Sequence, residues 1–140
     1  MDKLYTIKEL ENIGEKVINW CIDKFGLSKH HEYDPWLEID MVRTDNPLGE
    51  YVHDNNEIII YPNAIDNMDE FIGTIIHEYT HYMQSPSWYT RYANRKTELT
   101  VEELATYLVE GESSLDHPYE IEADKVAKKN WKQCKREILK

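Results

Sequence analysis

Cysteine, glycine, proline and basic residues are all scarce in this sequence, and it has no long apolar run. Its two cysteines, Cys21 and Cys134, are too few for a disulfide scaffold, so we expect both to be reduced residues of the core. No apolar run approaches the roughly 20 residues that cross a bilayer. The first residues also lack the basic and then apolar order of a signal peptide. We therefore expect a cytoplasmic protein without a membrane span.

Glycine and proline occur here only as breaks between secondary-structure elements. The five glycines and five prolines stand singly, and no repeat, low-complexity tract or flexible linker separates two parts of the chain. Apolar residues make up 41% and charged residues 31% of the composition, as in globular proteins rather than disordered ones. Residues 1–140 are therefore expected to form a single domain.

Positive charge is the other deficit of the composition. The chain has 16 Lys and Arg residues against 27 Asp and Glu residues, which gives a formal net charge of −11. Duplex binding needs clustered Lys and Arg to neutralise phosphates, so we expect no nucleic-acid partner. One basic cluster lies on the last predicted helix, and we interpret it as a solvated face rather than a site for an anionic partner or membrane surface. It consists of Lys125, Lys128, Lys129, Lys132, Lys135 and Arg136.

The order of apolar residues predicts an α+β fold that begins with a helix and a small sheet. Thr6 and Glu9 form a capping box, and apolar residues then recur every three or four positions up to Gly26, which predicts the helix. Alternation over residues 36–43 predicts a first strand. Two short segments at 51–53 and 58–61, joined by a tight connection, predict two more strands. We expect a short, mainly antiparallel, three-stranded sheet.

Three further helices are expected after the sheet. Asn67 can cap a helix that ends by Pro86 and has a broad apolar face. A capping box of Thr100 and Glu103 starts a short helix that ends at residue 111. Pro118 suits the first turn of a last helix. The apolar stripe of this last helix consists of Ala123, Ala127, Trp131, Cys134 and Ile138.

The central predicted helix contains the sequence HExxH at residues 77–81. The four-residue spacing of His77 and His81 turns both imidazoles to the same side of a helix, within reach of one metal ion. A lone histidine is more simply explained as a surface or hydrogen-bonded residue, but two at this spacing with Glu78 between them indicate a metal site. The apolar neighbours are expected to be core residues: Tyr79, Tyr82 and Met83.

The earlier histidines give no comparable signal. His30 and His31 precede a strand in a polar stretch, and His53 lies alone near a turn. None of them has a partner at ligand spacing, so we expect three solvated side chains rather than ligands.

A catalytic zinc site needs a third protein ligand and one open position. The longer metzincin motif is absent because Ser87 stands where its third histidine belongs. An acidic ligand is therefore favoured, and the start of the last helix offers Glu120, Glu122 and Asp124. Glu120 and Asp124 share one face of that helix, which continues along the apolar stripe, whereas Glu122 points about 160° away from Glu120. We expect Glu120 to be the ligand.

Together these motifs resemble the gluzincin metallopeptidases, in which HExxH is followed by a downstream helix that carries ExxxD or ExxAD. Residues 120–124 match ExxAD. In size and layout the chain is most similar to minimal zincin domains of the ImmA/IrrE and SprT-like kind, over most of residues 36–131. The chain differs from both, because ImmA/IrrE proteins usually have Asn in place of Asp124 and SprT-like proteins use a third histidine.

The resemblance implies a zincin-like fold with one bound zinc ion. It implies that His77, His81 and Glu120 are the zinc ligands and that Asp124 holds a ligating histidine. It also implies an edge strand, expected at residues 58–61, that receives an extended peptide substrate by strand addition. Three residues are candidates for the oxyanion donor, and the sequence does not rank them. They are Tyr107, His117 and Tyr119.

Zinc in such a site lowers the pKa of its bound water and polarises a carbonyl, and Glu78 is placed to act as general base and acid. The sequence thus predicts a zinc-dependent endopeptidase that acts on an intracellular protein substrate. Two non-hydrolytic alternatives stay open: a regulatory binding module that keeps the zincin fold, and a structural zinc protein with four protein ligands. The intact Glu78 favours catalysis. The sequence carries no signal for an oligomeric state.

Overall fold

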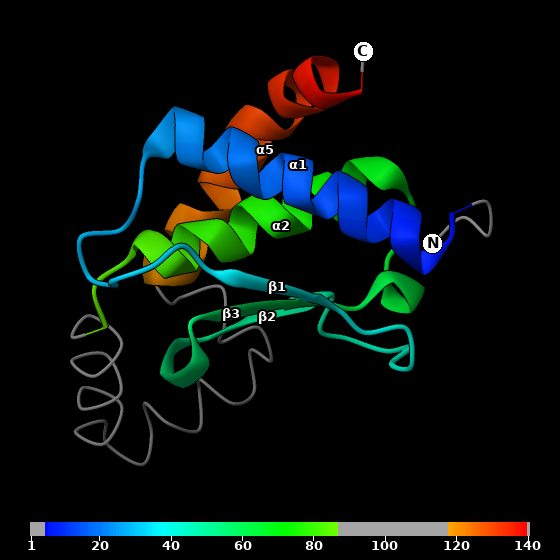
Figure 1. The fold of residues 1–140 in the computed structure, drawn as a ribbon, viewed down its shortest axis with the longest axis horizontal. Coiled ribbons are helices and arrows are strands. Elements are labelled where there is room, and N and C mark those ends of the chain that lie inside the picture. Colours follow the sequence, from blue (N-terminus) through cyan, green and yellow to red (C-terminus); the bar gives the residue numbers. More distant parts are fainter. Residues whose placement is uncertain (1–4, 87–117, 140) are drawn as a thin grey trace, which may run out of the picture.

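The computed structural model describes residues 5–86 and 118–139, and Figure 1 shows their arrangement. The order of these elements is a helix, three strands and two helices, which confirms the α+β class for the described part of the chain. The expected helix over 101–111 lies outside the described residues. The elements are α1 (Ile7–Phe25), β1 (Trp36–Ile39), β2 (Gly49–Val52), β3 (Glu57–Ile60), α2 (Met68–Met83) and α5 (Pro118–Ile138).

The first helix begins and ends where its sequence predicts. The Thr6 hydroxyl accepts a hydrogen bond from the Glu9 backbone N–H at 3.1 Å, and the Glu9 carboxylate accepts one from the Thr6 N–H at 3.0 Å. This reciprocal pair satisfies two backbone donors at the start of α1. Gly26 ends the helix at φ 81°, a conformation that favours glycine.

The sheet is mixed rather than mainly antiparallel, which corrects one expectation. Its strand order is β1-β3-β2, with β2 and β3 antiparallel and β1 and β3 parallel. The hairpin of β2 and β3 follows the prediction, because Asn56 adopts a left-handed conformation in the short connection. After β1 the chain skips the neighbouring position in the sheet and forms β2 at the edge. It then turns back as β3, which fills the middle position and runs parallel to β1.

The first strand is shorter than the alternation of residues predicts. It ends at Ile39, and the Asp40 carboxylate accepts a hydrogen bond from the Val42 N–H at 2.9 Å. This local turn competes with further strand pairing. The faces are as predicted, because Ile39 is buried while Leu37 and Met41 pack against the core.

The core lies between the sheet and the helices, which cover one side of it (Figure 1). The central helix α2 contributes more of the large buried side chains than any other described element, and Asn67 caps it by accepting from the Glu70 N–H at 2.9 Å. Tyr79 and Tyr82 are fully buried, which confirms them as core, and Met83 is partly buried against them. The other α2 residues in this core are Phe71, Ile72, Ile75 and Ile76.

The last helix packs along α2 and also contacts α1. Its predicted stripe is confirmed, because Ala123 and Cys134 are fully buried and Ala127, Trp131 and Ile138 pack against the core. Two side-chain contacts hold its second half in place. Lys135 pairs with Asp69 of α2, and Glu137 accepts a hydrogen bond from the Trp20 indole of α1 at 3.0 Å.

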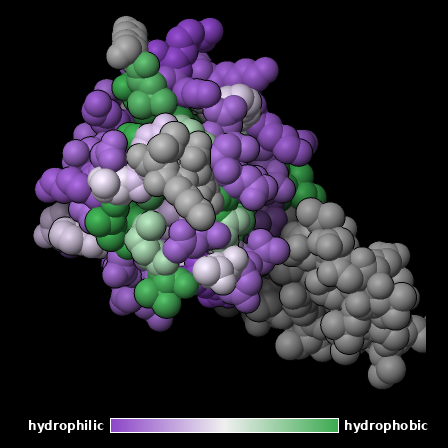
Figure 2. Space-filling view, turned by 90° about the vertical axis from the view of Figure 1, so that its right-hand side faces the viewer, coloured by the Kyte–Doolittle hydropathy of each residue, from purple (hydrophilic) through white to green (hydrophobic). Residues whose placement is uncertain are grey.

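The surface of the described residues is mostly hydrophilic on the face shown in Figure 2, with apolar side chains in separate patches. Val42, Trp36 and Tyr33 are the most exposed large apolar residues. In the part of the chain that the structure describes, no helix is long and apolar enough to cross a membrane.

Candidate metal centre

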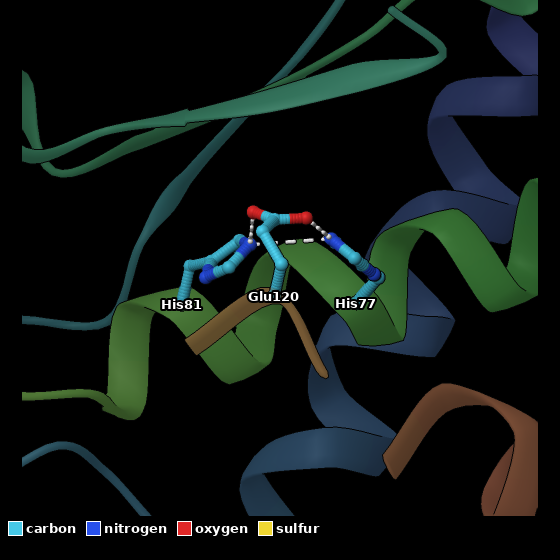
Figure 3. A group of neighbouring side chains, drawn as sticks. All are labelled: His77, His81 and Glu120. Atoms are coloured by element: carbon cyan, nitrogen blue, oxygen red, sulfur yellow. Dashed lines mark hydrogen bonds and ion pairs between the residues drawn. The ribbon is translucent and has the colours of Figure 1, made fainter. Parts of the chain in front are cut away.

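The two histidines of the HExxH motif project from the same side of α2 (Figure 3). The helix is continuous through both, so their spacing turns the rings toward each other. The Nε2 atoms of His77 and His81 lie 3.2 Å apart. Both rings are largely withdrawn from water, with side-chain exposures of 17% and 7%.

Glu120 supplies the third converging group from the first turn of α5. Its Oε1 atom lies 2.7 Å from Nε2 of His81, and its Oε2 atom lies 3.2 Å from Nε2 of His77 (Figure 3). One ligand atom from each of the three residues lies within 4.8 Å of the others. Among the described residues, this is the one group of three or more potential ligands that meets that distance.

Each histidine has an oxygen atom close to its opposite ring nitrogen, in an ion-pair contact for His77 and in a hydrogen bond for His81. Nδ1 of His77 lies 2.9 Å from Oδ1 of Asp124, and Nδ1 of His81 lies 2.7 Å from Oε1 of Gln84. Both partners are acceptors at these atoms and favour a neutral ring with its proton on Nδ1, whereas the Glu120 carboxylate competes for a proton on Nε2. With the proton on Nδ1, the Nε2 lone pairs of both histidines point toward each other and toward the Glu120 carboxylate.

This donor set fits a zinc ion. Two lone pairs and a carboxylate that converge within hydrogen-bond distance repel one another unless a cation lies among them. Two nitrogens bound to one tetrahedral zinc ion are about 3.3 Å apart, since each Zn–N bond is about 2.0 Å long. The observed Nε2–Nε2 distance of 3.2 Å is close to that value. Imidazole and carboxylate are also the ligand types that catalytic zinc sites use.

The pKa values of the ligands show the same demand for positive charge. Burial disfavours the imidazolium of His77, but the carboxylates of Glu120, Glu78 and Asp124 outweigh it and raise the pKa of His77 above its ordinary value. Burial opposes ionisation of Glu120, but hydrogen bonds from His77 and His81 hold the pKa of Glu120 well below its usual range. Glu120 thus stays ionised, and either a proton or a metal ion can lie between its carboxylate and the histidine nitrogens.

Glu78 lies beside the ligands without joining them. Its side chain is almost fully buried, and Oε2 is 4.0 Å from Nε2 of His77. Burial raises the pKa of Glu78, with the neighbouring His77 and His81 acting in the opposite direction. A carboxylate with a raised pKa accepts a proton from water more readily than an ordinary one.

The ligands open into a cleft of about 880 Å³. One wall is β2 with the two residues before it, and the other is formed by α2 and α5, including Gly73, Ala127 and Trp131. Because β3 is the central strand, the expectation that residues 58–61 form the edge at the site is wrong. The edge strand that lines the cleft is β2.

Gly49 allows β2 to lie close to α2. A Cβ atom at this position would be 2.9 Å from Cδ1 of Ile60, 3.0 Å from the Ile59 carbonyl oxygen and 3.0 Å from Cγ2 of Thr74. Thr74 is one helical turn before His77. The absence of a side chain at Gly49 therefore sets the width of the cleft near the metal ligands.

The other histidines are only partly as expected. His30 is exposed, but His31 stacks on Tyr82 and its Nε2 lies 3.1 Å from the Tyr51 hydroxyl. His53 packs edge-on against Tyr51 and lines the cleft. Two of the three are thus packed against aromatic rings rather than solvated.

The structure brings together His77, Glu78, His81, Glu120 and Asp124, as the sequence predicts. Of the candidate oxyanion donors, Tyr107 and His117 lie outside the described residues. Tyr119 packs edge-on against His81, at 5.9 Å between ring centroids. Sequence reasoning missed Gln84, whose only signal is a polar residue three positions after the second histidine. No family model, no curated protein and no solved structure matches this chain.

Proposed function

We propose that this chain is a zinc-dependent endopeptidase of the gluzincin type with a zincin-like fold. The observation that carries the proposal is the convergence of His77, His81 and Glu120 next to the buried Glu78, at the bottom of an open cleft. The resemblance of the two motifs to those of minimal zincin domains supports it. The two buried, unpaired cysteines suit a reducing compartment such as the cytoplasm.

The chain's own residues account for the remaining steps of peptide hydrolysis. Zinc at this site supplies Lewis acidity, which acidifies a water molecule and polarises the scissile carbonyl. Glu78 takes a proton from the attacking water and passes it to the leaving amine. Asp124 and Gln84 keep the Nε2 atoms of the two histidines unprotonated.

The shape of the cleft favours an extended peptide as the substrate. Among the described residues no strand pairs with the outer side of β2, which lies along the wall opposite the ligands, and a peptide can add to such an edge as a further strand. Glycine at position 49 keeps that edge within reach of the site. A protein substrate presents such a segment in a loop, a terminus or an unfolded region.

Two alternatives use the same fold without turnover. A regulatory binding module needs the cleft but not Glu78, and a structural zinc protein needs four ligands but not the cleft. Burial of the Glu78 carboxylate costs free energy that neither alternative explains. Catalysis explains it, because a general base must lie in the water-poor part of the site.

The variant Glu78→Gln tests the proposal. The amide keeps the shape of the side chain but does not accept the proton, so we expect one equivalent of zinc to stay bound while peptide hydrolysis falls by about 10²–10⁴-fold. Cleavage is measured on a library of unfolded, proteome-derived peptides by mass spectrometry of new amino termini, with bound zinc measured on the same samples.

The matched control is Glu11→Gln on the exposed face of α1, which should leave hydrolysis unchanged. Wild-type protein that binds zinc and cleaves no peptide points instead to a binding module. Cleavage by Glu78→Gln at the wild-type rate contradicts the role of general base.

A further inference from the structure

The buried side-chain amide of Gln84 makes three hydrogen bonds to residues that the structure describes. Its Oε1 atom accepts from Nδ1 of His81 at 2.7 Å, and its Nε2 atom donates to the Tyr119 carbonyl at 2.9 Å and to Oε1 of Glu122 at 3.1 Å. The residue is 5% exposed and stands at the C-cap of α2. The contacts thus join the end of the HExxH helix to the first turn of α5.

We infer that Gln84 is a positioning residue that places two of the three metal ligands at once. Its carbonyl oxygen holds His81 in the tautomer that directs the Nε2 lone pair toward the metal position. Its amide group holds the backbone of Tyr119, the residue before Glu120, and so sets how closely α5 approaches the histidines. This inference rests on the metal centre of the proposed function and adds a residue that neither motif contains.

A primary amide matches the contacts of Gln84 with the described residues. These contacts require one acceptor, directed at His81, and two donors, directed at a carbonyl and a carboxylate. Glutamate at this position keeps the acceptor but has no N–H to donate, and it places a second negative charge beside Glu122. Methionine has a similar length and neither group. The two substitutions therefore separate the two contacts of the amide.

The first measurement is the tautomer of His81 in metal-free Glu120→Ala protein, in which no carboxylate at position 120 competes for a proton on Nε2. It is read from long-range ¹⁵N–¹H correlations at mildly alkaline pH, where imidazoles are neutral. We expect the Nδ1–H tautomer in this background and after addition of Gln84→Glu, and a mixture of tautomers after addition of Gln84→Met. The second is amide hydrogen exchange in the first two turns of α5, which should be faster in both variants. Neither readout depends on zinc or on hydrolysis.

The third measurement is equilibrium zinc titration. Loss of a partner that orients a ligand typically weakens metal binding by 10–100-fold, so we expect a loss of about that size for Gln84→Met and a smaller one for Gln84→Glu. Gln133→Met is the matched control. Gln133 lies on α5 more than two helical turns past Asp124, and it is not among the residues that line the cleft. It should change none of the three readouts.

Several results overturn the inference. An Nε2–H tautomer of His81 in the Glu120→Ala background, where Gln84 is intact, shows that Gln84 does not hold the Nδ1–H form. Unchanged amide hydrogen exchange in α5 of Gln84→Glu shows that the Gln84 amide does not hold the backbone of Tyr119 in place. Failure of the proposed function is a different result, because it appears as absent hydrolysis or absent zinc binding in wild-type protein with the tautomer and exchange data unaffected.

Discussion

At the scale of single residues, the site is organised by pairs. Each histidine has its own acceptor on Nδ1, and both share one carboxylate on Nε2. The pairing explains why a buried site tolerates Glu120 as an ion: the cost of burying its charge is offset by two hydrogen-bond donors or by a metal ion. Removal of Glu120 and removal of its neighbour Glu122 should therefore have very different effects.

We predict that Glu120→Ala weakens zinc binding by about 100-fold or more, because it deletes a ligand and the loss of an outer partner alone costs 10–100-fold. Glu122→Ala removes the hydrogen bond that Gln84 donates to Glu122, a loss of about 1 kcal/mol, or less than about tenfold in affinity. Zinc titration of the two single variants measures both. A larger loss from Glu122→Ala than from Glu120→Ala overturns the ligand assignment.

Local spacing made the convergence of these side chains predictable from the sequence. His77 and His81, and likewise Glu120 and Asp124, are four residues apart on one helix, so their common face follows from helix geometry alone. Gln84 escaped prediction because its role depends on Tyr119, 35 residues later in the chain. A contact of that kind is set by how two helices pack, which spacing does not encode.

At the scale of secondary-structure elements, the sheet is where prediction failed. Each strand was expected close to its place, but period-two alternation identifies the faces of a strand and not its neighbours. The run Ile58-Ile59-Ile60 is the one local sign that β3 is central, since strands with apolar residues on both faces are typical of sheet interiors. The position of β2 at the edge follows, and its fit against α2 depends on Gly49.

We predict that Gly49→Ala destabilises the protein by about 1–3 kcal/mol, because the new methyl group meets the Ile59 carbonyl and Thr74 at 3.0 Å. It should also lower peptide hydrolysis by moving β2 away from α2. Gly73→Ala is the contrasting variant. Its nearest neighbour, Cβ of Trp131, is 4.0 Å away, and alanine in a helix gains roughly 0.5–1 kcal/mol over glycine.

Urea-induced unfolding of the two variants and of wild-type protein measures the differences in their free energies of unfolding. Equal stability of Gly49→Ala and wild-type protein means that the strand moves without cost and does not define the cleft.

At the scale of the whole molecule, the proposed metal centre connects distant parts of the chain. Two of its proposed ligands lie on α2 and the third lies on α5. A ligand that binds only the folded state adds to its stability, by about 2.7 kcal/mol at a free concentration 100 times its dissociation constant. Zinc should therefore contribute to the stability of the whole fold and not only to hydrolysis.

We predict that this contribution falls with decreasing pH, since zinc binds only neutral imidazoles and protons compete for the same nitrogens. The raised pKa of His77 in the metal-free site means that protons bind it more tightly than an ordinary histidine. The loss should thus begin above pH 6.5, the ordinary histidine value, and continue below it. The depressed pKa of Glu120 keeps that ligand ionised throughout this range.

Melting temperatures with added zinc and with a chelator, measured across this pH range, test the prediction. The two curves should differ most at neutral pH and converge in acid. A melting temperature that responds to neither zinc nor chelator at neutral pH is incompatible with a metal ion that is coupled to folding.

The burial of both cysteines makes the motion of α5 measurable by thiol chemistry. Cys134 lies on α5 and Cys21 on α1, both without solvent exposure, and burial raises the pKa of Cys134 to about 12. A thiol in this state reacts with an alkylating reagent only when its helix separates from the core. If zinc holds the start of α5 through Glu120, saturating zinc should slow the labelling of Cys134, and mass spectrometry of timed samples would record that delay as the lifetime of the closed helix pair.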